Sequence, residues 1–242
     1  KWIGTLKAYA GMSPDEGLWN GQGTFMRFTR KSQSLNTLKS NNTGEDISKE
    51  LRSFNINEMK NQRNLLPDYV DVTPPYSMGL HRDRELMNTT HQLTTHNLFK
   101  LKNGGDVKVS LTYQHHAEEA YKETESVYYE DGQKEWVVSD AEEGKFTQNT
   151  LMATFSTERN ESTYNLSERF SVNMDWTERD ISLSGQEDNI QDLYGGSKKL
   201  VNDLYLLKRN NNQFYNLSSY TVFHSNPQNI RVQSIDRNLV QK

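Results

Sequence analysis

The sequence predicts an all-β protein, an antiparallel up-and-down meander of about eight strands. Three observations predict this fold: long segments in which apolar and polar residues alternate, short turn-rich connections between them, and an abundance of Asn, Ser, Thr and Tyr. Alternation with a period of two is typical of strands that have one apolar and one polar face. No run of about 18 apolar residues occurs, so the sequence predicts no transmembrane helix.

The clearest hairpin spans residues 150–176, with a polar turn at 158–162. Along its second arm, 163–176, apolar and polar side chains alternate, and only Glu168 interrupts the apolar row. The apolar row is Tyr164, Leu166, Phe170, Val172, Met174 and Trp176, and the opposite face includes Arg169, Asn173 and Asp175. A strand of roughly 9–11 residues, tilted, is the length that crosses a bilayer in an outer-membrane barrel.

The other strands are predicted from the same alternation. They lie at 2–11, 21–31, 90–101, 107–114, 200–208 and 214–224, and a further strand begins in the tail at 225–233. Tight turns join several of them. Asn-Gly-Gly within 102–106 supplies the positive φ of a hairpin turn, and 209–213 is a second short polar turn.

Three intervals lack this alternation. We expect a long irregular interval at about 36–88, and long loops at about 115–148 and 177–199. Short and long connections then alternate along the second half of the chain. Outer-membrane barrels have tight turns at one end and long loops at the other, whereas a soluble sandwich has no reason to collect every long loop at one end. The pattern therefore favours an outer-membrane β-barrel.

Composition limits the alternatives. The chain has 242 residues and no cysteine, which excludes disulfides, thiolate chemistry and a cysteine-based zinc site. The net charge is −4 and the basic residues are dispersed, so nothing suggests nucleic acid as a partner. The sequence starts at Lys1 without a start methionine or a signal segment, so either a leader has been removed or the chain is a piece of a longer one.

Five segments carry a resemblance to a known family. They are 34–44, 80–115, 127–132, 149–160 and 223–232. In the alternation of residues along their strands and in the residue types of their turns, these segments resemble the barrel of TonB-dependent receptors of the Bacteroidetes type. These include the carboxypeptidase-regulatory-like-domain-containing receptors. The resemblance covers most of the chain from residue 36 onward and includes no single diagnostic motif.

The resemblance implies a transport function without catalysis. Such receptors are barrels of about 22 strands around an N-terminal plug, and they import scarce nutrients across the outer membrane with energy passed through TonB. This chain has too few strands for that barrel and shows neither a plug nor a TonB-contacting segment. The resemblance thus implies a section of a larger barrel in the outer membrane of a Gram-negative bacterium. Its partners would be the lipid bilayer, the TonB system through a plug absent from this chain, and a surface lipoprotein.

Candidate ligand-binding residues are the aromatic side chains of the expected loop at 115–148. Tyr128, Tyr129 and Trp136 could stack on a substrate such as a sugar ring, with simple packing as the alternative. Eight other aromatic residues lie near strand ends or on apolar faces, where they fit either a membrane girdle or a soluble core. These are Trp2, Trp19, Tyr113, Tyr164, Trp176, Tyr205, Tyr220 and Phe223.

No metal, cofactor or catalytic site is predicted. His115 and His116 are adjacent and His91 and His96 are five residues apart, so on strands each pair points to opposite faces. The acidic residues of 118–131 lack the spacing of an EF-hand, and no nucleophile elbow or phosphate-binding loop is present. Two other functions stay open: a soluble extracytoplasmic β-rich module that binds glycan or protein, and a structural outer-membrane barrel without import.

Overall fold

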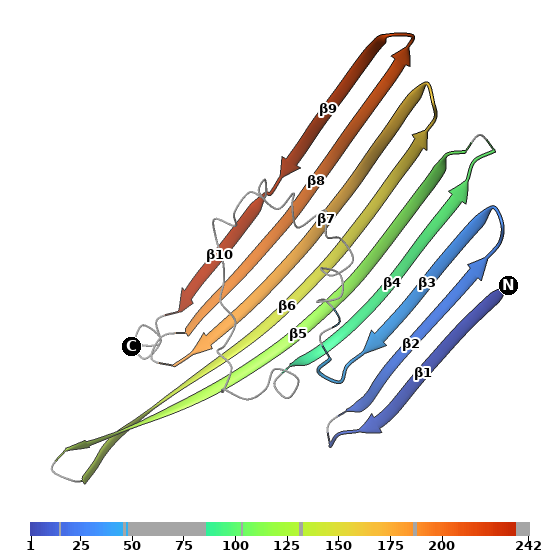
Figure 1. Cartoon of the computed structure of the whole chain (residues 1–242). Coiled ribbons are helices and arrows are strands. Elements are labelled where there is room, and N and C mark those ends of the chain that lie inside the picture. Colours follow the sequence, from blue (N-terminus) through green and yellow to red (C-terminus); the bar gives the residue numbers. More distant parts are fainter. Residues whose placement is uncertain are drawn as a thin grey trace.

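The computed structural model describes residues 1–14, 16–45, 47, 86–102, 104–130, 133–185 and 188–235, with the backbone alone at 130, 133–136 and 235. Within these ranges the chain forms a single ten-stranded antiparallel sheet (Figure 1). The predicted all-β meander is therefore confirmed, and in its described part the sheet is open, not closed into a barrel. None of the described residues forms a helix long and apolar enough to cross a membrane.

The strands follow one another across the sheet in chain order, except that β9 and β10 share one edge of β8. They are β1 (Trp2–Met12), β2 (Gly17–Phe28), β3 (Ser32–Asn41), β4 (Met87–Lys100), β5 (Asp106–Glu130), β6 (Gln133–Asn160), β7 (Tyr164–Ser184), β8 (Asp188–Asn210), β9 (Gln213–Ser225) and β10 (Gln228–Ile235). The strands from β5 to β8 have 25, 28, 21 and 23 residues. Strands of globular proteins are usually about 5–6 residues long.

β9 and β10 are two parts of one edge strand. The register along β8 continues without a shift, since Ser225 lies opposite Lys198 and Gln228 opposite Gly195. Between them the Gly196 amide donates to the Pro227 carbonyl over 3.0 Å. Proline has no N–H with which to return this bond, so the ladder is interrupted there.

One row of directly opposed residues crosses the sheet, and we call it the reference row. From β2 to β9 it contains Thr24, Thr37, Thr94, Thr112, Met152, Asn173, Lys199 and His224. Directly opposed residues of antiparallel strands place their side chains on the same face. The row therefore provides a common origin for positions on all of these strands.

The short turns climb steadily away from the reference row, and Figure 1 shows them as a staircase. Beyond the row, β2 extends four residues to Phe28, β4 six to Lys100, β6 eight to Asn160 and β8 eleven to Asn210. The step is about one residue per strand. The rise is about 3.3 Å per residue, and neighbouring strands are about 4.8 Å apart. With this step, all the short turns lie in one plane when the strands tilt by about 40° from the perpendicular to that plane. Closed barrels have tilts of about 35–45°.

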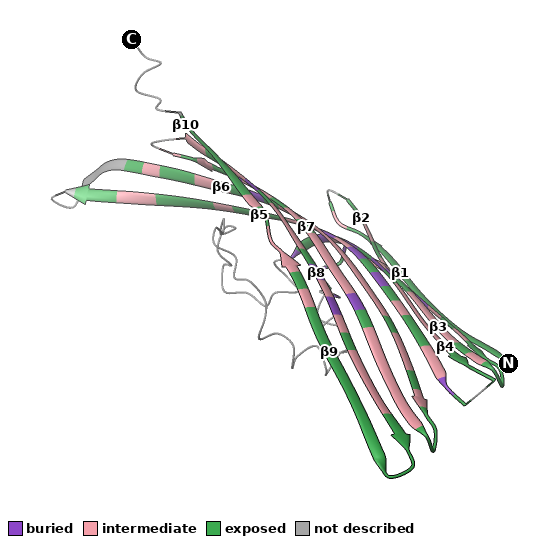
Figure 2. Ribbon diagram, turned by 90° about the horizontal axis from the view of Figure 1, so that it is seen from above, coloured by how far each residue is buried: buried purple, intermediate pink, exposed green. Residues whose placement is uncertain are grey.

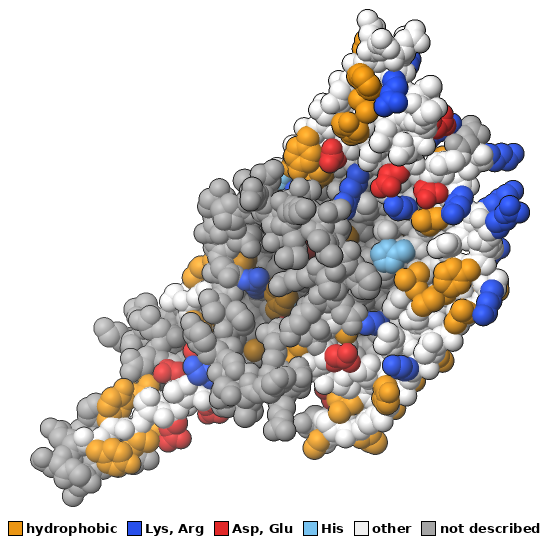
Figure 3. Space-filling model, in the orientation of Figure 1, with side chains coloured by type: hydrophobic (Ala, Val, Ile, Leu, Met, Phe, Trp, Pro, Cys, Tyr) orange, Lys and Arg blue, Asp and Glu red, His pale blue; other side chains and the backbone are white. Residues whose placement is uncertain are grey.

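The two faces of the sheet differ in chemical character. The apolar face is the one that carries Phe170, Val172 and Met174 of β7, and the register adds Leu111 of β5 and Leu200 of β8 to it. The polar face carries Arg169, Asn173 and Asp175 together with the reference row. The predicted division of β7 into two faces is therefore confirmed. Figure 3 shows charged side chains of both signs scattered over one face of the sheet.

Burial is inverted relative to that of a soluble domain. On the apolar face Leu6 is 76% exposed and Phe170 40%, whereas on the polar face Thr90 is 0% and Gln114 3% exposed. Among the described residues the buried apolar side chains are Ile47, Leu86, Ile181, Leu193 and Val201. Figure 2 shows correspondingly few buried positions along the twisted strands. Soluble domains bury most of their large apolar side chains, so this apolar face needs a neighbour outside the described residues.

Both predicted long loops are wrong, because these residues extend the strands. Residues 115–130 belong to β5 and residues 133–148 to β6, and the two strands pair from Asp106–Glu158 to Glu130–Gln133 with one irregularity between Tyr128 and Tyr129. Residues 177–184 form the end of β7, and residues 188–199 form the start of β8. Polar side chains occupy both faces in much of these stretches, so no alternation marks them although the main chain remains paired.

The predicted irregular interval at 36–88 also overlaps strands at both ends. β3 occupies its beginning, and β4 starts at Met87. β3 gives no apolar alternation because Leu35 and Leu38 point to opposite faces; it is a strand because its backbone pairs with β2 and β4. Residues 46 and 48–85 lie outside the described residues, so the expectation for that part stays open. The described residues thus form ten strands, where about eight were predicted.

Candidate functional site

A band of apolar side chains crosses the apolar face from β1 to β9. On β7 it runs from Tyr164 to Trp176, which is about 40 Å along the strand at about 3.3 Å per residue. If the strands tilt by about 40°, this length corresponds to a band height of about 30 Å, measured perpendicular to the plane of the turns. The apolar core of a bilayer is about 30 Å thick, and the apolar band of an outer-membrane barrel is about 25 Å tall. The band therefore has the height of a membrane.

Arginines lie over aromatic rings at the edge of the band near the short turns. The Arg27 Cζ atom is 5.3 Å from the centre of the Trp2 ring, and the two residues are directly opposed. The Arg159 Cζ atom is 5.2 Å from the centre of the Tyr164 ring. Amphipathic aromatic rings and long cationic side chains are typical of membrane–water boundaries, because they present an apolar body and a polar tip.

At its other edge the band ends in polar aromatic residues, and we call this edge the long-loop rim. Trp19 Nε1 donates to Ser40 Oγ and the Tyr113 hydroxyl donates to Asn149 Oδ1, each over 2.9 Å. Trp176 lies directly opposite Asn149. A few residues further on, the same face carries the charged row Glu119, Lys145, Asp180, Asp192 and Arg231. The face thus changes from apolar to aromatic to charged, as at the surface of a bilayer.

Most of the eight aromatic residues for which the sequence left a membrane girdle and a soluble core open lie on the apolar face. These are Trp2, Trp19, Tyr113, Tyr164, Trp176 and Phe223. Tyr205 and Tyr220 lie on the polar face instead, because the register places Tyr205 opposite Ser167 and Tyr220 opposite Asp203. The pairing of whole strands decides which face a residue occupies, and nearness to a strand end does not.

Carboxylates crowd together just beyond the long-loop rim. Asp180 lies directly opposite Asp192, and Glu178 lies opposite Tyr194. Burial raises the pKa of Asp180, the carboxylates of Glu178 and Asp192 raise it further, and Lys145 opposes them. The negative charge of Glu178 is the main cause that raises the pKa of the Tyr194 hydroxyl. This part of the face therefore favours protonation and attracts cations.

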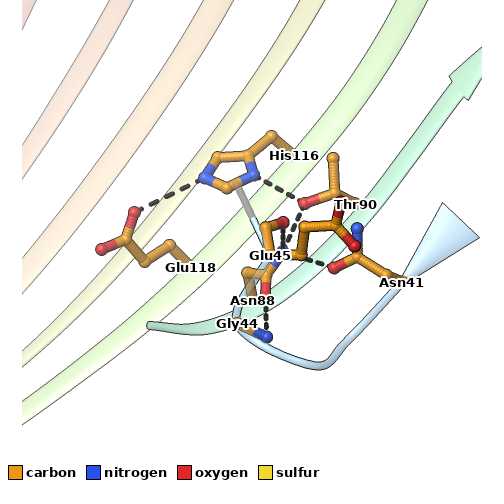
Figure 4. A network of polar contacts seen from close by, with 7 residues as sticks. All are labelled: Asn41, Gly44, Glu45, Asn88, Thr90, His116 and Glu118. Atoms are coloured by element: carbon orange, nitrogen blue, oxygen red, sulfur yellow. Dashed lines mark hydrogen bonds and ion pairs between the residues drawn. The ribbon is translucent and has the colours of Figure 1, made fainter. Parts of the chain in front are cut away.

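A buried network of hydrogen bonds lies on the polar face where the chain leaves β3 and enters β4 (Figure 4). Asn88 is at its centre. Its Oδ1 accepts from the Gly44 amide over 3.0 Å, and its Nδ2 donates to Asn41 Oδ1 over 3.1 Å and to Thr90 Oγ1 over 2.7 Å. Asn41 and Thr90 are almost completely buried. Gly44 has a φ of 79°, which favours glycine at this bend.

The network continues from Thr90 to β5. The Thr90 hydroxyl lies 2.8 Å from His116 Nδ1, and His116 Nε2 lies 3.4 Å from Glu118 Oε2. Because Thr90 accepts from Asn88, its own hydroxyl proton is free for His116 Nδ1. In the neutral imidazole this order places the ring proton on Nε2, where it points at Glu118. Each hydrogen bond in this series is then donated in the direction that leads from Asn88 to Glu118.

The network fastens the two ends of the connection between β3 and β4 to each other. Asn42 adds a second attachment, since its Oδ1 accepts from the Trp19 amide over 2.7 Å and its Nδ2 donates to the Gly17 carbonyl over 2.9 Å. The side chains of the network form hydrogen bonds with one another, and none of them is an activated nucleophile. The arrangement therefore suits a structural clamp and not a reaction.

The candidate ligand-binding residues lie on a projecting arm, which we define as residues 120–130 of β5 and 133–140 of β6. β4 ends opposite Glu119 and β7 ends opposite Ala141, so no third described strand pairs with the arm (Figure 1). Tyr128 and Tyr129 are 47% and 67% exposed. The backbone of Trp136 lies opposite Tyr128, but its side chain is outside the described residues. The arm thus exposes at least two tyrosine side chains.

The predicted faces of the histidines agree with the register. His116 lies on the polar face and His115 on the apolar face, and His96 and His91 divide in the same way. What the sequence did not indicate is that His91 and His115, which come from different strands, are directly opposed. The described residues contain no group of three or more His, Asp or Glu side chains that could hold a metal ion. Of the acidic residues at 118–131, Glu118 and Glu119 lie on opposite faces, and Asp131 is outside the described residues.

No protein-family model matches the chain, and no curated protein matches it.

Proposed function

We propose that the chain forms part of the wall of an outer-membrane β-barrel transporter of the TonB-dependent receptor type that its sequence resembles. The inverted burial is the observation that carries this proposal. Large apolar side chains are exposed on one face, while Thr90, Gln114 and Lys199 are buried on the other. A sheet in water would turn its apolar face inward, whereas a barrel wall in a bilayer turns that face to the lipid.

The geometry of the sheet supports the same proposal. The tilt inferred from the stagger of the turns, the band height of about 30 Å and the aromatic rims at both edges are properties of outer-membrane barrels. The short turns then lie on the periplasmic side, and the arm and the connection after β3 on the external side. On this proposal the polar face lines a wet lumen, and the protein imports a nutrient without performing catalysis.

The two outer edges of the sheet are consistent with a section of a larger wall. In the described part of the chain β1 has β2 as its single partner, and β9 and β10 pair with β8 alone. A strand edge inside a bilayer must be paired, because no water is present to satisfy its amides and carbonyls. Further strands would therefore complete the barrel, and energy from TonB would arrive through the plug of the complete receptor.

The competing proposal is a soluble extracytoplasmic module that binds glycan or protein. The projecting arm with exposed Tyr128 and Tyr129 is the observation that favours it. In such a module the apolar face would be covered by protein, so it would be inaccessible both to lipid and to water.

Spin labels on β7 test the choice between these proposals in the native host membrane. Labels at Phe170 and Val172 should be accessible to oxygen, which dissolves in lipid, and protected from a water-soluble nickel chelate. Labels at Ser171 and Asn173, on the polar face, should show the reverse. Protection from both quenchers at Phe170 and Val172, in a product that fractionates with soluble proteins, would reject the barrel and support the module.

A further inference from the structure

We propose that His91 and His115 form a binding site for a divalent transition-metal ion at the long-loop rim, with Cu²⁺ bound most tightly. The two residues come from β4 and β5 and are directly opposed in the register. Their rings lie on the apolar face with centroids 6.2 Å apart and planes only 16° from parallel. This inference does not depend on whether the apolar face meets lipid or another protein.

The surroundings of His115 fix which ring nitrogen is free. Its Nδ1 lies 2.9 Å from Asn149 Oδ1, an amide oxygen that also accepts the Tyr113 hydroxyl. An amide oxygen only accepts hydrogen bonds, so His115 must carry its proton on Nδ1. Its Nε2 then holds a lone pair, which is the form of imidazole that binds a metal.

His91 is held in a similar way from the other side. Its Nδ1 lies 2.9 Å from Ser40 Oγ, which in turn accepts the indole N–H of Trp19 over 2.9 Å. The hydroxyl of Ser40 can accept from both donors, which leaves Nε2 of His91 available. No hydrogen bond from another described residue reaches Nε2 of either histidine, so both rings are oriented through Nδ1 alone.

This arrangement matches the usual surroundings of metal-binding histidines. Such a residue normally donates its second ring N–H to a carbonyl or carboxylate, which sets its tautomer and orientation. Imidazole nitrogens bind a metal ion at about 2.0–2.1 Å. Two rings with centroids 6.2 Å apart can share one ion if their side chains rotate to turn both Nε2 atoms toward it. The side chain of His91 is exposed, so water can complete the coordination. Two imidazoles favour Cu²⁺ over Ni²⁺ and Zn²⁺ in the Irving–Williams order.

Sequence spacing alone does not reveal this pair of histidines. His91 and His115 are 24 residues apart, and each has a histidine nearby in sequence, His96 and His116, that points to the opposite face. Only the register of β4 against β5 brings the correct two rings together.

Copper titration of the purified, detergent-solubilised protein tests the site. At one equivalent of Cu²⁺, electron paramagnetic resonance should show coupling to two nitrogens, and His91→Gln and His115→Gln should each weaken binding by more than tenfold. Asn149→Ala removes the support of His115 and should weaken binding by about 10–100-fold. His96→Gln, on the polar face with its Nδ1 2.9 Å from Ser110 Oγ, should bind as tightly as the unmodified protein.

Two results would overturn the proposal. The first is unchanged copper affinity in both His91→Gln and His115→Gln. The second is loss of the tightest site in His116→Gln, which would place the ion beside Glu118 on the polar face. If a variant does not fold, the nitrogen coupling of the unmodified protein still decides, because a single coupled nitrogen is incompatible with a two-histidine site.

Discussion

Phe155 of β6 and Phe170 of β7 lie directly opposite each other on the apolar face, and each is 40% exposed. The pair lies in the middle of the band, between the arginine–aromatic contacts and the long-loop rim. A charged substitution at this depth should respond more strongly to the difference between lipid and water than one elsewhere in the sheet.

Replacement of Phe155 by arginine tests the environment of the band. In a bilayer the charge should lower the free energy of unfolding by about 2–4 kcal/mol. Thr154→Arg, one residue away on the polar face, is the matched control and should cost much less. The measurement is denaturant unfolding of the membrane-embedded protein. Equal costs for the two variants would contradict a lipid-facing band.

Removal of the Asn88 side chain tests the clamp between β3 and β4. Asn88→Ala leaves the buried Gly44 amide and the Asn41 side chain without a partner, and each unsatisfied buried group costs about 1–3 kcal/mol. The unfolding free energy should therefore fall by at least that amount. Asn216→Ala, at an exposed position on β9, should change it by less than about 0.5 kcal/mol. If both variants have the same stability, the network does not act as a clamp.

Asp180→Asn should change the dependence of stability on pH. A carboxyl whose pKa is raised by folding contributes stability that is full below about pH 3.8, its unfolded value, and lost as the pH rises through the folded pKa. At neutral pH the uncharged variant should therefore be more stable, by about 0.5 kcal/mol once solvent screening of this half-buried surface group is taken into account. The difference should shrink as the pH falls. Thermal unfolding at several pH values checks this, with Glu125→Gln on the arm as the control. A constant difference at every pH would show that charge repulsion is not the cause.

Asn211 tests the turn between β8 and β9. Its φ is 51°, a left-handed conformation that asparagine tolerates and β-branched residues do not. Asn211→Val should lower the unfolding free energy by about 1–2 kcal/mol, and Asn211→Gly should lower it little or not at all. The neighbouring Asn212→Val is the control. If valine is tolerated equally at both positions, the turn is not held in this conformation.

The sequence predicts the fold best for strands that face water on one side and an apolar neighbour on the other. The faces of β7 and the short turn that contains Gly104, whose φ is 81°, are confirmed. The prediction fails at β3 and along the arm. There the backbone still pairs, but the side chains of both faces are largely polar or irregular, so pairing leaves no periodic signal.

The candidate sites were less predictable because they are made across strands. Asn88 bonds to Asn41, 47 residues earlier, and Thr90 to His116, 26 residues later. Local spacing carries no information on which residue of a distant strand will be opposite. The aromatic residues Tyr128 and Trp136 show the same limit, since the pairing of β5 with β6 places them opposite each other.

The reference row also restricts how this chain can change length during evolution. Insertion of one residue inside the band, for example between Val109 and Tyr113, would move every following side chain of that strand to the other face. Insertions within the band should therefore survive only in pairs or next to a compensating deletion. The arm lies beyond the band, and among the described strands its two halves pair only with each other, so it can grow or shrink by matched steps. Length variation should accordingly accumulate at one end of the sheet, and the surface on that side can diversify while the wall stays constant.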